Sequence, residues 1–192
     1  MKALYSRVLT SLSEQLSTSA LNHSVATAVA AAEIAADYEL DADEARLAGL
    51  AHDRARDICH EQLIDLAEKH HLTISTVDRE VPYLLHAQIG AILLGEEFPE
   101  MSPRVIDAVA RHTVGALEMT DLDMVVYIAD MTEPGRDFLG VDDLRADIGQ
   151  VPLDELFCRA YRHSVAHLVA TRRRMHPDTL AVWNAVVAGD RP

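Results

Sequence analysis

The chain has 192 residues, of which 49% are hydrophobic and 25% charged, and its formal net charge is −14. A surface this acidic repels nucleic-acid polymers and anionic membranes, and no stretch reaches the roughly 18 apolar residues that a membrane span needs. The only cysteines, Cys59 and Cys158, and a first segment without a signal-peptide pattern predict a cytoplasmic protein without disulfide bonds.

Abundant Ala and Leu favour helices, and no segment alternates in the way of a half-buried strand. We therefore expect an all-α fold and a single domain over residues 1–192, with a motif-bearing core at about 21–144 and a helical tail at about 152–189. The stretch PGRDFLGVDDL, residues 134–144, is the clearest irregular loop. The expected helices cover residues 3–16, 23–38, 41–52, 61–71, 82–94, 103–112, 120–131, 153–169 and 177–189.

Several of these boundaries depend on residues that are typical of helix ends. Asp41 with Glu44, and Thr120 with Asp123, have the spacing of N-terminal capping pairs. Gly95 is typical of a C-terminal stop, so we expect the helix before it to end there.

Four of the ten histidines and two carboxylates lie in apolar, helical surroundings. They are His23 in ALNHSVA, His52 and Asp53 in LAHD, His86 in YLLHAQIGA, His112 in VARHTVG, and Asp130 in VVYIADMTEP. One such histidine alone is more often a hydrogen-bonded core residue, but six residues of these types together form a ligand set for borderline and hard transition metals. Because a carboxylate has two oxygens, Asp53 can bridge two ions.

The order of these six residues resembles the metal signature of HD domains, in the subset that holds two metals. More narrowly, LLHAQIGA, HTVGALEMTDLD and IADMTEPGR are similar to segments of the bacterial YqeK-type symmetrical diadenosine tetraphosphate hydrolases. The resemblance covers roughly residues 21–144, and the helices that follow fit the helical tail of that family.

The resemblance implies an HD-domain helical bundle with a dinuclear site, most often of iron, although Mn, Co, Ni and Zn suit the same donors. The implied ligands of one ion are His23, His52, Asp53 and Asp130. Those of the other ion are Asp53, His86 and His112. The family splits diadenosine tetraphosphate into two ADP. His52 and Asp53 are then catalytic through two ions that share an attacking hydroxide.

Arginines are expected to bind the phosphate chain, since the guanidinium group matches phosphate oxygens. Arg136 in EPGR is the first choice and Arg56 the second. Thr113 and Gly115 are expected to add a hydroxyl and a backbone NH.

Each of these substrate contacts has an ordinary alternative, which the sequence leaves open. Arg136 can form a loop salt bridge with Asp137 or Asp142. Arg56 can be a solvated residue at a helix end, and Thr113 can make a hydrogen bond that ends a helix.

Three positions depart from the family pattern. Arg56 stands where Lys is usual, Ala20 stands where a basic residue is common, and Val114 replaces a second Thr. These positions surround the substrate rather than the metals. The expected partner is therefore a dinucleoside polyphosphate or another nucleotide. An HD-type nucleotidase or other nucleotide phosphohydrolase, and a non-catalytic metal- and nucleotide-binding regulatory module, stay open. So does the oligomeric state, a homodimer included.

The remaining histidines lack the context of a metal site. His163 and His167 are four residues apart, but no third ligand lies near them in the sequence, so we interpret them as surface or packing residues. His176, before Pro177, is typical of a helix start.

Overall fold

A computed structural model describes residues 2–189 as eleven α-helices and one 3₁₀ helix, and this part of the chain contains no strand. The all-α prediction is confirmed. The elements are α1 (Lys2–Gln15), α2 (Thr18–Asp37), α3 (Ala42–Ala51), α4 (His60–Lys69), α5 (Thr76–Glu80), η1 (Pro82–Leu85), α6 (His86–Glu97), α7 (Pro103–Arg111), α8 (Asp121–Thr132), α9 (Val141–Asp147), α10 (Leu153–Ala170) and α11 (Pro177–Ala188). None of the described helices is long and apolar enough to cross a membrane.

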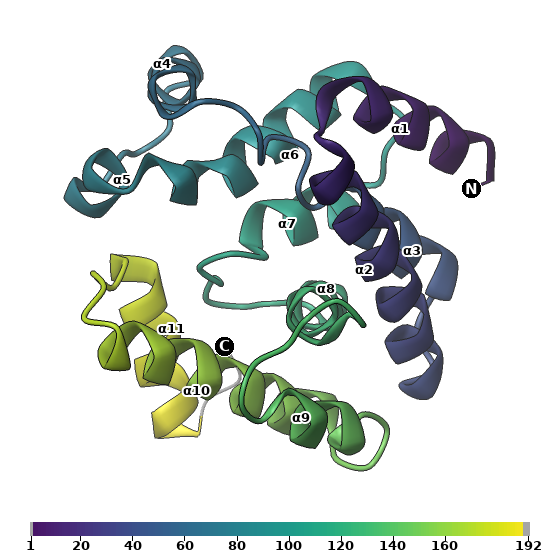
Figure 1. The fold of residues 1–192 in the computed structure, drawn as a ribbon, viewed down its shortest axis with the longest axis vertical. Helices are drawn as coiled ribbons and strands as arrows, with labels where there is room; N and C mark the ends of the chain where they lie inside the picture. Colours follow the sequence, from purple (N-terminus) through teal and green to yellow (C-terminus); the bar gives the residue numbers. More distant parts are fainter. Residues whose placement is uncertain (1, 190–192) are drawn as a thin grey trace.

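Helix α8 is the central element of the bundle. It packs against α2, α3 and α7 on one side and against α9 and α10 on the other, and Figure 1 shows it end-on in the middle of the molecule. Its apolar run from residue 124 to residue 129 is buried. The predicted capping pair starts it: the Thr120 side chain accepts from the Asp123 backbone NH, and the Asp123 side chain accepts from the Thr120 NH.

Helices α2 and α3 approach each other along small residues. A Cβ placed on Gly49 would lie 2.9 Å from the Thr27 carbonyl oxygen and 3.0 Å from the Ala31 Cβ. The end of α3 is therefore fixed against α2 by backbone contact rather than by flexible side chains. This matters for function because His52 directly follows α3 and His23 lies on α2.

The replacement of Gly49 by Ala is expected to destabilise the protein. The methyl group would push α2 and α3 apart, at a net loss of about 1–2 kcal/mol after the gain in helix propensity. Urea unfolding of Gly49→Ala measures this loss. The matched control is Gly95→Ala, since Gly95 also lies inside a helix but a Cβ there would meet no atom within 4 Å. We expect the control to gain about 0.5–1 kcal/mol, and a Gly49→Ala variant that gains equally would contradict the packing argument.

Two predicted boundaries are wrong. Helix α2 begins at Thr18 rather than at residue 23, because Ser17 caps it by accepting from the Ala20 NH at 3.3 Å. Helix α6 runs through Gly95 to Glu97, and it ends two residues before Pro99, which disfavours helical geometry in the residue that precedes it.

Two short helices were not predicted. Helix α5 starts with a capping box of Ser75 and Asp78, and α9 occupies the second half of the loop expected at 134–144. Gly140, at φ 95°, makes the turn into α9 in the left-handed region that glycine favours. Both helices are short, with five and seven residues, so they carry little hydrophobic periodicity for sequence reasoning to detect.

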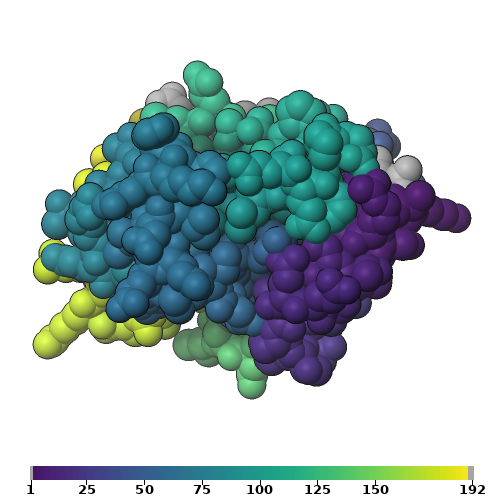
Figure 2. All heavy atoms as spheres, turned by 90° about the horizontal axis from the view of Figure 1, so that it is seen from above, coloured from purple at the N-terminus to yellow at the C-terminus, as the bar shows by residue number. Residues whose placement is uncertain are grey.

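The region from α4 to the start of α6 has a small hydrophobic cluster of its own, which includes Leu63 of α4, Leu85 of η1 and Ile89 of α6. Figure 2 shows this blue segment meeting the yellow C-terminal region at one edge of the molecule. There Arg174 forms an ion pair with Glu80.

Candidate metal centre

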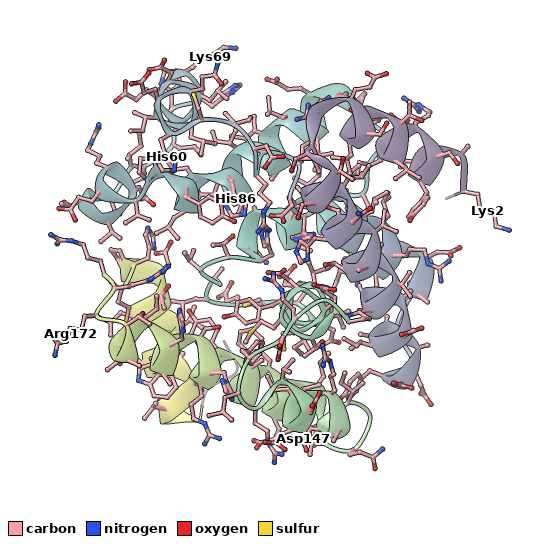
Figure 3. The ribbon with its side chains drawn as sticks, in the orientation of Figure 1. Lys2, His60, Lys69, His86, Asp147 and Arg172 are labelled. Carbon is pink, nitrogen blue, oxygen red and sulfur yellow. The ribbon has the colours of Figure 1, made fainter. Side chains whose placement is uncertain are left out.

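Five helices bring the six predicted metal-binding residues together in the middle of the bundle. Their positions are His23 in the second turn of α2, His52 and Asp53 directly after α3, His86 at the first residue of α6, His112 directly after α7 and Asp130 in the last turn of α8. Figure 3 shows His86 in the interior, whereas the labelled Lys2, Lys69 and Arg172 point outward. The centre therefore lies where the buried ends of several helices converge.

Asp53 is the hub of this arrangement and is 1% exposed. Its Oδ2 atom lies 3.2 Å from His52 Nε2 and 3.5 Å from His23 Nε2. Its Oδ1 atom lies 3.2 Å from His86 Nε2 and 3.7 Å from His112 Nε2. The two oxygens of one carboxylate thus face two different pairs of imidazoles.

Asp130 adds a second carboxylate on one side only. Its Oδ1 atom lies 2.8 Å from His23 Nε2 and 3.7 Å from His52 Nε2. His23, His52 and Asp130 can hold an ion together, since one ligand atom from each lies within 4.8 Å of the others. Ligand atoms of His52, Asp53 and His112 also lie within 4.8 Å of one another, so the two halves of the centre are contiguous.

Three of the histidines are oriented in the same way by the turn before them. The Nδ1 atoms of His52, His86 and His112 lie 2.8, 2.6 and 2.7 Å from the carbonyl oxygens three residues earlier. A carbonyl can only accept, so each Nδ1 carries the proton and donates it. In a neutral ring the lone pair is then on Nε2, which points into the centre, as in metal-binding histidines.

His23 is oriented by a residue that the sequence analysis missed. Its Nδ1 atom lies 3.2 Å from Oε1 of Glu133, a buried carboxylate just after α8. Glu133 is the first letter of the EPGR segment, from which only Arg136 was chosen. A carboxylate in this segment is visible in the sequence. The spacing between residues could not show that it contacts His23.

The protonation of the metal-free centre is uneven. Burial alone would lower the pKa of His52, but the carboxylates of Asp53 and Asp130 outweigh it and raise that pKa to about 9. Burial, followed by repulsion from His52 and His86, lowers the pKa of His112 to about 3.

The residues fit a bound cation. His52 Nε2 is buried and makes no well-directed hydrogen bond within the described residues, although Asp53 Oδ2 faces it at 3.2 Å, and a bound cation would satisfy this atom. Despite burial, His52 holds the pKa of Asp53 well below its usual range, and His23, with a hydrogen bond, does the same for Asp130. Ionised carboxylates and inward-facing imidazoles form the donor set of borderline transition metals.

Metal uptake is expected to release a proton from His52. With a pKa of about 9, this imidazole is protonated at pH 7 in the metal-free protein, and the proton must leave before Nε2 can bind an ion. Metal affinity should therefore fall as the pH falls below about 9. Calorimetric titration of metal-free protein at pH 7, in two buffers of different ionisation enthalpy, counts the protons. The control His70→Gln should release the same number, and a heat independent of the buffer would contradict the prediction.

The two arginines chosen as phosphate ligands both reach the centre. Arg56 forms an ion pair with Asp53, and Arg136 forms one with Asp130 while its Nε donates to the Asp130 carbonyl at 2.7 Å. The alternative partner Asp142 pairs with Arg145 instead. Arg56 and Arg136 are 32% and 34% exposed, so both can contact a bound molecule.

Thr113 and Gly115 have different outcomes. Thr113 Oγ1 lies 3.1 Å from His112 Nε2, beside the centre. The substrate contact expected of Gly115 stays a prediction, and in this structure the Gly115 backbone NH donates to the Arg111 carbonyl at 3.0 Å. Gly115 makes a left-handed turn at φ 77° against the ring of Tyr161.

Comparison with known proteins now identifies the family. Residues 20–135 match the HD domain. This chain belongs to the HD domain family. An HD domain implies that divalent metal is bound, and the cluster around Asp53 supplies His and Asp groups able to bind it.

Relatives of this HD domain protein align over nearly its full length. It is 29% identical to a symmetrical bis(5'-nucleosyl)-tetraphosphatase of Bacillus subtilis over 181 residues, which is 94% of this chain and 96% of the relative. A Staphylococcus aureus protein of the same name is 28% identical and covers 89% of this chain and 88% of its own. A crystal structure of a predicted HD superfamily hydrolase involved in NAD metabolism, from Clostridium acetobutylicum, superposes with a TM-score of 0.90, at 28% identity, over 97% and 98% of the two chains.

Proposed function

We propose that this protein is a metal-dependent phosphohydrolase that cleaves diadenosine tetraphosphate symmetrically into two ADP. The observation that carries the proposal is the position of Asp53, whose two oxygens face two separate pairs of imidazoles. Its relatives named symmetrical bis(5'-nucleosyl)-tetraphosphatase support the choice of substrate.

In this proposal, His23, His52, Asp53 and Asp130 would hold one metal ion. Asp53, with its second oxygen, would hold the other ion together with His86 and His112. When bound, such a pair of ions lowers the pKa of water and neutralises charge on phosphoryl oxygens. We propose iron, and the same donors suit Mn, Co, Ni and Zn.

The residues of the chain do the positioning. The three Nδ1–H groups that donate to backbone carbonyls fix the imidazole planes, and Glu133 fixes His23, so the centre needs little reorganisation. Arg136 and Arg56 turn from their carboxylate partners toward the phosphate chain, where the guanidinium fork matches phosphoryl oxygens. The Thr113 hydroxyl donates a hydrogen bond at the same place.

Separation of the reaction products tests the proposal. Metal-loaded protein is incubated with diadenosine tetraphosphate and the nucleotides are resolved by chromatography. ADP as the only product is the expected result, and AMP with ATP, or no cleavage, would overturn it. A parallel panel of nucleoside mono-, di- and triphosphates tests the alternative of a nucleotidase, which the departures at Ala20 and Arg56 motivate. The predicted cytoplasmic location and the oligomeric state stay open in this proposal.

A further inference from the structure

The C-terminal helices α10 and α11 lie outside the part of the chain that matches the HD domain, residues 20–135. They nevertheless contact the segment that joins α7 to α8, which carries His112 and Thr113. His112 is a proposed metal ligand, and Thr113 lines the cavity of about 200 Å³ at the centre. One loop therefore separates the C-terminal helices from the metal centre.

The contact is made at the backbone carbonyl of Val114. Tyr161 of α10 donates its hydroxyl to this carbonyl at 2.6 Å, and Thr179 Oγ1 of α11 lies 3.5 Å from the same oxygen. Val114 is only 9% exposed, and a buried carbonyl needs a partner inside the protein. Burial raises the pKa of the Tyr161 phenol, so the group keeps the proton that this bond requires. The backbone at Val114 is thus tied to the C-terminal helices.

The next residue, Gly115, fits closely against the same tyrosine. A Cβ placed on Gly115 would lie 3.2 Å from Tyr161 Cε2 and 3.4 Å from its hydroxyl oxygen. The φ of 77° at Gly115 lies in the left-handed region that glycine favours, and its NH donates back to Arg111. The turn after α7 is therefore held by Tyr161 on one side and by α7 on the other.

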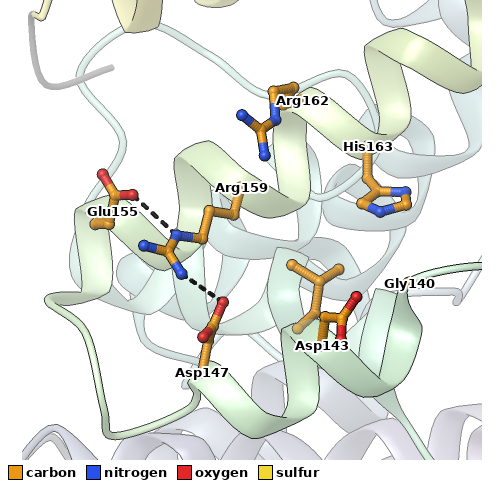
Figure 4. Close-up of a pocket in the computed structure, with 8 residues that line it drawn as sticks. Gly140, Asp143, Asp147, Glu155, Arg159, Arg162 and His163 are labelled. Atoms are coloured by element: carbon orange, nitrogen blue, oxygen red, sulfur yellow. Dashed lines mark hydrogen bonds and ion pairs between the residues drawn. The ribbon is translucent and has the colours of Figure 1, made fainter.

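Tyr161 itself is fixed by packing that does not involve this turn. It is 1% exposed, and its ring packs against those of Tyr127 and Phe157, with centroids 5.5 and 5.3 Å apart. Figure 4 shows how α10 is anchored to α9 nearby, where Arg159 forms an ion pair with Asp147 at 2.7 Å. The position of the phenol is therefore set by α8, α9 and α10, and the turn after α7 adapts to it.

Thr113 is the residue through which this contact can affect chemistry at the centre. Its Oγ1 atom lies 3.1 Å from His112 Nε2 and 3.4 Å from His86 Nε2. Because peptide units are planar, a fixed carbonyl at Val114 restricts the backbone from which the Thr113 side chain projects. A group that contacts substrate must be held within about 0.5 Å of its productive position.

We infer that Tyr161 is a positioning residue, whose hydroxyl holds the Val114 carbonyl and thereby directs the Thr113 hydroxyl toward a phosphoryl oxygen of the substrate. This inference rests on the proposed function. It gives the C-terminal helices a part in the reaction. The alternative is a hydrogen bond that only stabilises the fold, and its loss would act independently of Thr113. The two roles therefore differ in whether the effect of Tyr161 depends on Thr113.

A double-mutant cycle of Tyr161→Phe and Thr113→Val tests this dependence. Tyr161→Phe keeps the packed ring and removes only the hydroxyl, and Thr113→Val removes the other hydroxyl at nearly constant volume. Calorimetry on the metal-loaded, full-length proteins measures the Kd for inorganic pyrophosphate, and steady-state kinetics measures kcat/KM for diadenosine tetraphosphate. The matched control is Tyr38→Phe, since the Tyr38 hydroxyl also donates to a carbonyl, that of Val151 at 2.9 Å, but does not line the centre.

The Kd for pyrophosphate should rise about tenfold in Thr113→Val and about fivefold in Tyr161→Phe, as for a lost or misdirected hydrogen bond to a charged group. The kcat/KM should fall by similar factors. In the Thr113→Val background, Tyr161→Phe should change neither quantity by more than about twofold. Tyr38→Phe should also leave both within about twofold. An unchanged Kd in Tyr161→Phe, or an equal effect of Tyr161→Phe in both backgrounds, would overturn the inference.

Circular dichroism verifies that each variant folds. If Tyr161→Phe does not fold, Gly115→Ala takes its place, because its methyl group would push the turn away from Tyr161, and the same dependence on Thr113 is expected. The expected coupling in pyrophosphate binding, without cleavage of diadenosine tetraphosphate, would refute the proposed function and leave the positioning role standing. Cleavage to ADP with independent effects of the two substitutions would do the reverse.

Discussion

The replacement of Asp53 by Asn is expected to reduce kcat for diadenosine tetraphosphate by about 1,000-fold or more. Asp53 is the residue whose two oxygens face both pairs of histidines, and an amide offers one weaker oxygen in place of two anionic ones. The loss of metal-based charge stabilisation is worth several kcal/mol, and about 4 kcal/mol corresponds to 1,000-fold. Steady-state kinetics at saturating metal measures the change.

The matched control for this variant is Asp65→Asn. Asp65 is exposed on α4 and does not line the cavity at the centre, so the same chemical change there should leave kcat within about twofold, as for surface substitutions in general. Circular dichroism must show that Asp53→Asn folds. A folded Asp53→Asn protein with a kcat near that of the wild type would remove the basis for the enzyme proposal.

The second large effect is expected for His86→Ala. His86 Nε2 lies 3.2 Å from Asp53 Oδ1, on the side of the centre away from Asp130. Its removal leaves the proposed ligands of the first ion, which include His23 and Asp130, complete. The second ion loses one of its three proposed ligands. We expect one ion to be retained, one to be lost, and kcat to fall at least about 100-fold, since two-metal chemistry needs both ions.

His70→Ala controls for the loss of an imidazole. His70 lies beside Glu96 with an Nδ1–Oε1 distance of 3.9 Å, outside the centre. Metal content and kcat should be unchanged in this variant. If His86→Ala retained full metal content and full activity, the assignment of the second ion would be wrong.

The sequence was sufficient to choose the residues that converge on the centre. Each of the six lies in an apolar helical stretch, where a carboxylate or imidazole is costly unless it is paired, and that cost is visible without a structure. The hydrogen bonds that orient these side chains could be predicted from the sequence only in part. The bond from His52 Nδ1 to the carbonyl of Gly49 follows from the position of His52 at a helix end, but the pairing of His23 with Glu133 joins residues that are 110 positions apart.

The residues proposed to contact substrate were harder to predict from the sequence, because their surroundings also depend on contacts between distant parts of the chain. The sequence supplied Arg136 and Arg56, but it could not show that the Gly115 backbone NH donates to the Arg111 carbonyl. His163 and His167 share a helix face by their spacing, yet only tertiary packing shows that this face borders a cavity. That the chain forms a single domain stays a prediction.

The number of metal ions per chain tests the central claim most directly, because the account depends on one carboxylate that serves two ions. Elemental analysis of the purified protein, loaded with iron and freed of excess metal, gives this ratio. The account predicts about two ions per chain, as expected of a two-metal site. A ratio of one or less under saturating conditions would contradict it.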